Sequence, residues 1–110
     1  MAHDPELADR IRELLATDPD VVEKRMFGGL AFLVAGRLAV SANSRGDLLV
    51  RVAPAQADAL LADPRASPFV MRGRELTGWL GVSIDASATE EELQEWVDHG
   101  VRYARSLPPR

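Results

Sequence analysis

Two histidines, His3 and His99, are the side chains best suited to act as a general base or to bind a metal ion. His3 lies close to the N-terminus, and His99 follows Asp98 in the last predicted helix, one residue away from the apolar stripe. Neither has a second histidine four residues along the chain, as a zinc-binding pair on a helix would. We therefore expect no metal site, and we expect His99 to be solvated or to cap the helix.

The other candidates for covalent or phosphate chemistry lack the partners that this chemistry needs. No Gly-x-Ser-x-Gly turn surrounds Ser41, Ser67 or Ser83, and the sequence contains no cysteine nucleophile. The pair Gly28-Gly29 matches neither the dinucleotide-binding nor the P-loop glycine pattern. The acidic run Glu90–Glu92 is consecutive, so its side chains fan around a helix and do not form a paired acid site. We predict a protein that is not an enzyme and has no cofactor.

Trp79 is the side chain that most strongly indicates a binding surface. It alternates with Leu80, Val82 and Ile84, so it points away from the helices if those three residues face them. Arg51 would lie on the same face among small residues, and Trp and Arg are frequent at the centres of protein interfaces. We expect this open sheet face to contact a second subunit, a partner protein or a tail of the same chain. The alternative is an ordinary sheet face on which Trp79 fills a corner.

Charge is unevenly distributed along the 110 residues, whose net charge is −4. Eight basic and three acidic residues lie between Lys24 and Arg74, so the two ends carry the acidic excess. One interpretation is that the terminal helices have solvated acidic faces, which would leave the sheet side less acidic than the helix side. The other is a basic segment over 24–74 that binds an anionic partner, in which case the protein is a weak nucleic-acid binder. The acidic total disfavours the second interpretation.

The composition is that of a globular protein, and we expect a cytoplasmic protein with a single domain over residues 1–110. The longest apolar run, Leu30–Ala35, is far shorter than a bilayer requires, and the first residues do not resemble a signal peptide. We expect no membrane partner.

Periodicity predicts helices over residues 4–16, 54–62 and 89–106, and the last of them buries Trp96. Its capping box is formed by Thr89 with Glu92, or in a rival register by Ser87 with Glu90. Strand patterns cover 21–27 and 30–34, which we count as one strand broken at Gly28-Gly29, where we predict a bulge or a positive φ. Further strands are expected over 37–43, 47–52, 68–71 and 78–84, with hairpin turns at Ala35-Gly36 and Arg72-Gly73-Arg74. The fold class is α+β. We predict a two-layer sandwich in the order α-β-β-β-α-β-β-α, with a five-stranded, mainly antiparallel sheet and the helices on one face.

A short motif before the apolar hairpin, together with a downstream Gly-Trp pair, resembles the N-terminal domain of the TfoX/Sxy family of bacterial competence regulators. The likeness covers nearly the whole chain, and it is carried by Arg25, Met26, Phe27, Gly28, Gly29, Gly78, Trp79 and the tail 104–109.

The resemblance implies a two-layer sandwich and supplies no catalytic residues. Full-length members have a second, C-terminal domain and help a transcription activator to switch on DNA-uptake genes, whereas we expect this sequence to be a stand-alone first domain. The implied function is a non-catalytic, protein-binding module linked to transcription or competence regulation, with a small-molecule-binding domain as a further alternative. The motif residues are expected to serve structure first, and to form an interaction surface with Arg51 second.

Overall fold

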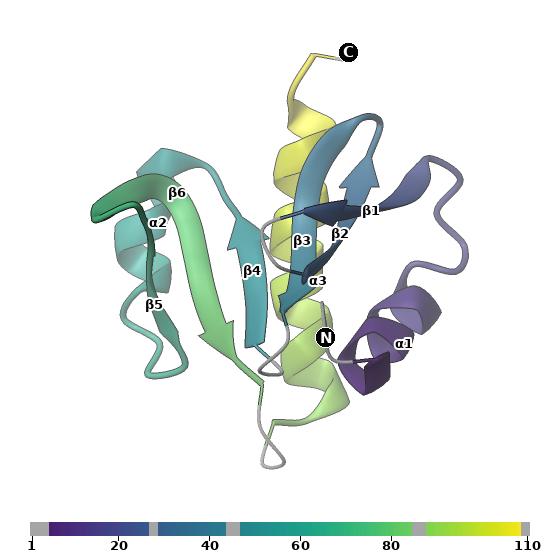
Figure 1. Cartoon of the computed structure of the whole chain (residues 1–110), viewed down its shortest axis with the longest axis horizontal. Coiled ribbons are helices and arrows are strands. Elements are labelled where there is room, and N and C mark those ends of the chain that lie inside the picture. The colour runs from purple at the N-terminus through teal and green to yellow at the C-terminus, as the bar shows by residue number, and fades with distance from the viewer. Residues whose placement is uncertain (1–4, 27–28, 44–46, 85–87, 109–110) are drawn as a thin grey trace.

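The computed structural model describes residues 5–26, 29–43, 47–84 and 88–108, which form three helices and six strands (Figure 1). The helices are α1 (Pro5–Leu14), α2 (Pro54–Leu60) and α3 (Glu90–Ser106). The strands are β1 (Val21–Met26), β2 (Gly29–Val34), β3 (Arg37–Asn43), β4 (Asp47–Arg51), β5 (Ala66–Met71) and β6 (Arg74–Ser83). All neighbouring strands are antiparallel, and their order in the sheet is β1-β2-β3-β4-β6-β5. The predicted α+β class is therefore confirmed.

The number of strands differs from the prediction, because residues 21–34 form a hairpin and not one strand with a bulge. Met26 and Gly29 face each other in register, so β1 and β2 are separate antiparallel strands and the sheet has six strands. A glycine pair permits either a bulge or a chain reversal, and only the pairing between the two strands distinguishes them.

Gly29 does not have the predicted positive φ. Glycine is required at this position for another reason. A Cβ at Gly29 would overlap the carbonyl oxygen of Ala42, because β2 and β3 approach each other closely at this point. The same prediction for Gly28 falls outside the described residues.

Two hairpins are closed by two-residue turns in the left-handed region. Ala35 and Gly36 have φ values of 52° and 82°, and Arg72 and Gly73 have values of 54° and 77°. Two consecutive positive φ values are typical of type I′ turns, whose twist matches that of the flanking strands. Both predicted turns are confirmed.

All three helices pack on the same face of the sheet. The core beneath them contains Ile11 of α1, Ala57 of α2 and Leu93 of α3, packed with Phe32, Leu48 and other strand residues. Trp96 belongs to this core and is 5% exposed, as the helical stripe predicted. None of the described helices is long and apolar enough to cross a membrane.

The long helix α3 is fixed at both ends and at its centre. The predicted capping box is present: Glu92 N donates to Thr89 Oγ1 at 3.1 Å, and Thr89 N donates to Glu92 Oε1 at 3.2 Å. At the centre, Gly100 lies so close to β3 that a Cβ would overlap the carbonyl oxygen of Ala39. Near the C-terminal end, Arg105 forms ion pairs with Asp18 and Asp20. These contacts fix the position of α3 behind β3 and β4 (Figure 1).

Candidate functional site

His99 is half-buried on α3, and its ring packs against that of Trp96 with 5.8 Å between centroids. A hollow of about 220 Å³ is lined by His99 and Ser106 among other residues. The hydroxyl of Ser106, however, donates to the carbonyl oxygen of Tyr103 at 2.7 Å. Within the described ranges, no group of three His, Cys, Asp or Glu side chains could hold a metal ion. His3 lies outside those ranges.

The sheet face opposite the helices carries a second apolar cluster. Ala31, Leu38 and Leu49 are buried in it, and Trp79 and other partly buried side chains pack against them. Leu48 and Val50 belong to the core on the helix side, so the strands alternate as expected. The structure thus places Trp79 on the face that the sequence pattern predicted.

Arg51 holds Trp79 from the neighbouring strand. The two residues are opposite each other in the β4–β6 register, and the Arg51 guanidinium carbon lies 5.2 Å from the centroid of the Trp79 ring. The same carbon lies 5.5 Å from the ring centroid of Tyr103, which comes from α3. Arg51 is the last residue of β4, and α3 continues past the end of this strand (Figure 1), so one guanidinium contacts aromatic rings from both layers.

Tyr103 was missed by sequence reasoning. It follows Trp96 by two helical turns, so the period predicts which side of α3 it occupies. The period does not reveal that β4 ends beside this part of the helix.

An irregularity in β6 positions Trp79. Gly78 has a φ of 84°. Its carbonyl oxygen accepts a hydrogen bond from Val52 N at 2.8 Å. A Cβ added to Gly78 would also lie only 2.8 Å from the carbonyl oxygen of Val52. On the side where β6 pairs with β5, the register shifts between Pro68 and Val70. Phe69 is therefore the single β5 residue opposite residues 76–79 of β6. The Gly-Trp pair therefore has a structural reason, since only glycine adopts this φ freely beside such a close backbone contact.

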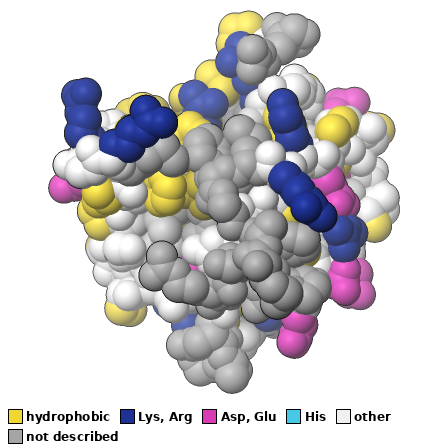
Figure 2. All heavy atoms as spheres, viewed as in Figure 1, with side chains coloured by type: hydrophobic (Ala, Val, Ile, Leu, Met, Phe, Trp, Pro, Cys, Tyr) yellow, Lys and Arg dark blue, Asp and Glu magenta, His cyan; other side chains and the backbone are white. Residues whose placement is uncertain are grey.

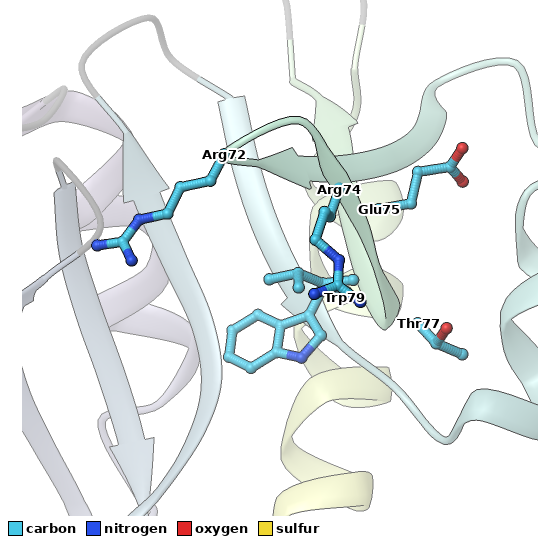
Figure 3. A pocket seen from close by; sticks show the side chains of 6 residues that line it. Arg72, Arg74, Glu75, Thr77 and Trp79 are labelled. Carbon is cyan, nitrogen blue, oxygen red and sulfur yellow. The ribbon is translucent and has the colours of Figure 1, made fainter.

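The bend in β6 borders a hollow of about 360 Å³ lined by Arg72, Arg74, Glu75, Leu76, Thr77 and Trp79. Figure 3 shows Arg74 extending toward the Trp79 indole, while Glu75 and Thr77 point to the other side of the strand. A second hollow of about 270 Å³ is lined by Phe69, Ser67 and Gly81, among other residues. Gly81 follows Trp79 by two residues, so the surface continues along the same face of β6.

The two layers differ in charge as expected. The described helices carry nine acidic and four basic residues, whereas the strands carry three acidic and five basic residues. Figure 2 shows basic side chains next to hydrophobic ones at the corner that β5 and β6 occupy in Figure 1. The sheet layer is thus the less acidic one.

The structure divides the predicted site residues into two groups. Arg51, Gly78 and Trp79 lie together at β4 and β6. Arg25 is exposed on the edge strand β1, where Met26 ends the strand and faces Gly29. The position of β1 at the edge opposite β5 separates the two groups in the sheet. Phe27 and Gly28 fall outside the described residues.

Taken together, these features define a two-layer α+β domain with an aromatic and arginine-rich surface on its sheet. The family model of the TfoX N-terminal domain matches residues 13–104. The chain belongs to this family, which is linked to competence regulation, and the resemblance inferred from the sequence is confirmed. Searches of curated proteins and of solved structures gave no match.

Proposed function

We propose that this chain is a non-catalytic, protein-binding module with a regulatory role, and that it binds its partner through the sheet face around Trp79. Membership in a family linked to competence regulation supports the regulatory part. The observation that carries the binding part is the contact of Arg51 with the rings of Trp79 and Tyr103, beside an apolar cluster on the face opposite the helices.

This arrangement suits recognition of a protein surface. Leu33, Phe69 and Trp79 are only partly buried, so they offer apolar area to a partner, and no described helix packs over them. Arg51 contacts two rings, which reduces the side-chain entropy that binding would otherwise cost. Tryptophan and arginine also provide much of the binding energy at many protein interfaces.

Nucleic-acid binding through the basic segment 24–74 is supported less well. Arg65 pairs with Glu92 at 3.0 Å, and Arg37 donates to the carbonyl oxygen of Pro108. Arg51 is engaged with two aromatic rings, and Arg25 lies at the other edge of the sheet. The described basic residues of this segment therefore do not line one continuous groove along which a phosphate backbone would run.

The proposal is tested by capturing partners from a lysate of the native host on the immobilised chain, with three variants in parallel. Trp79→Ala removes the central ring, Arg51→Glu reverses the adjacent charge, and Val22→Ala is the control because Val22 is 61% exposed on β1. Circular dichroism checks that each variant is folded. Size-exclusion chromatography shows whether the partner is a second copy of the chain.

We expect a protein that is retained by the parent and by Val22→Ala and lost by the other two variants. Folded Trp79→Ala and Arg51→Glu variants that retain the same proteins as the parent would show that this face is not the binding surface.

A further inference from the structure

Ion pairing divides the arginines of this chain into two groups. Four of them pair with carboxylates at N–O distances between 2.5 and 3.4 Å, namely Arg10, Arg12, Arg65 and Arg105. Within the described part of the chain, the other six arginines form no such pair, namely Arg25, Arg37, Arg51, Arg72, Arg74 and Arg102. Three of these six lie near the exposed apolar surface: Arg51 contacts the Trp79 ring, and Arg72 and Arg74 line the hollow beside it.

The turn between β5 and β6 carries two of these arginines, of which Arg74 extends toward the Trp79 indole and Arg72 extends away from it (Figure 3). Arg72 and Gly73 form the turn with positive φ, and Arg74 begins β6 on its far side. Leu76 and Trp79 supply the apolar part of the 360 Å³ hollow that Arg72 and Arg74 line. Glu75, the one carboxylate among the lining residues, points to the opposite side of β6 (Figure 3). The hollow therefore combines two donors for an anion with a surface for an apolar group.

We propose that this hollow binds the carboxylate of an acidic side chain in an extended segment of the partner protein, while a neighbouring apolar side chain of that segment packs on Trp79. This inference rests on the proposed function and names the chemistry of the partner. Guanidinium groups form short, charge-assisted and often bidentate hydrogen bonds with carboxylates. The charge complementarity comes from Arg72 and Arg74, and the affinity for the apolar side chain from Trp79 and Phe69.

The shape and charge of the surface favour a peptide over a polyphosphate chain. The second hollow continues along β6 past Trp79, so an occupant that uses both must be extended. Asp47 and Arg65 both line this second hollow, and Arg65 is already paired with Glu92, so Asp47 would repel a backbone that carries a phosphate at every step. A segment with its acidic residue at the Arg72 end and apolar or polar residues beyond it meets no such repulsion.

The test uses a phage-displayed library of random 12-residue peptides, selected on the full chain. We expect the selected peptides to share an Asp or Glu next to apolar residues. Fluorescence anisotropy then compares a selected peptide with its Glu→Gln or Asp→Asn counterpart, and we expect the neutral version to bind about tenfold more weakly.

The double variant Arg72→Gln/Arg74→Gln should bind the acidic and the neutral peptide equally well. The matched control Arg25→Gln/Arg102→Gln removes two positive charges from exposed positions on β1 and α3, and it should keep the tenfold difference. A charge swap adds an independent check: Arg72→Glu/Arg74→Glu should prefer a peptide with lysine in place of its acidic residue.

Several results would overturn the inference. They are a library without binders, selected peptides that lack acidic residues, an unchanged tenfold difference in Arg72→Gln/Arg74→Gln, or tighter binding of a twelve-residue oligothymidylate. If Trp79→Ala weakens the binding of every peptide while Arg72→Gln/Arg74→Gln keeps the preference for the acidic peptide, only the proposed carboxylate site is wrong. If Trp79→Ala binds all peptides like the parent, the proposed binding surface itself is wrong.

Discussion

Replacing Gly100 by alanine should destabilise the protein, although the same change stabilises most helices. Gly100 is buried in the middle of α3, where it contacts β3. In a helix interior, alanine is favoured over glycine by about 1 kcal/mol. Here the new Cβ would overlap the carbonyl oxygen of Ala39 and come within 2.9 Å of both Ala39 C and Val40 Cγ1. Since two of these three atoms belong to the main chain, they cannot rotate away.

The net effect follows from these two opposing terms. Overpacking a well-packed core costs about 1–3 kcal/mol, and a collision with the backbone lies at the upper end of this range. After subtraction of the gain in helix propensity, we expect Gly100→Ala to lower the free energy of unfolding by about 2 kcal/mol. The collision would also push α3 away from the sheet. Tyr103 lies one turn further along the helix, so its contact with Arg51 should weaken.

Urea denaturation followed by far-UV circular dichroism measures the loss of stability. The matched control is Gly81→Ala, because a Cβ at Gly81 would lie 3.5 Å from Ser67 Oγ, which is an ordinary contact. We expect the control to differ from the parent by less than about 0.5 kcal/mol. A Gly100→Ala variant as stable as the parent, or more stable, would show that α3 does not pack against β3 as closely as the structure indicates.

Two further predictions concern a turn and a helix cap. Ala35 has a φ of 52°, which favours asparagine over alanine, so Ala35→Asn should raise the free energy of unfolding by about 0.5–1 kcal/mol, and Ala35→Val should lower it. Equal stability of these two variants in urea would contradict the left-handed turn. The backbone N–H of Thr89 and then the guanidinium of Arg65 lower the pKa of Glu92 below its ordinary value of 4.5. Because the folded state favours the carboxylate, Glu92 stabilises the fold above pH 4.5, and this contribution is lost as the pH falls through the lowered pKa. Glu92→Gln should therefore make stability less dependent on pH in the acidic range, and a pH profile identical to that of the parent would contradict this.

Several elements could be predicted from sequence because their determinants are local. Thr89 and Glu92 are three residues apart and cap the same helix turn, so both halves of the capping box are visible in one short segment. The turn at Ala35-Gly36 joins two runs with strand propensity, and nothing distant is needed to place it. The alternation of Leu48 and Leu49 between the two faces follows directly from the pleat of a strand.

Pairing between strands was harder to predict, because it depends on residues that are distant in sequence. Gly28-Gly29 was interpreted as a bulge or a positive φ within one strand, whereas the register of Met26 with Gly29 shows a hairpin. The start of β6 was placed at Gly78, although the strand begins at Arg74. Residues 74–77 include two charged side chains and lack the apolar alternation of a strand, but the turn at Arg72-Gly73 lets β6 pair with β5 from Arg74 onward.

The candidate site combines both kinds of information. Alternation along β4 and β6 predicts that Arg51 and Trp79 share a face, since this requires only the two-residue period. The contribution of Tyr103 depends on where β4 ends relative to α3, and that relation is set by the packing of Gly100 on β3. The orientation of Arg51 is thus determined by both layers of the fold. A partner that binds at Trp79 would meet a guanidinium already in contact with two rings, so the preorganisation of this surface depends on how α3 packs against the sheet.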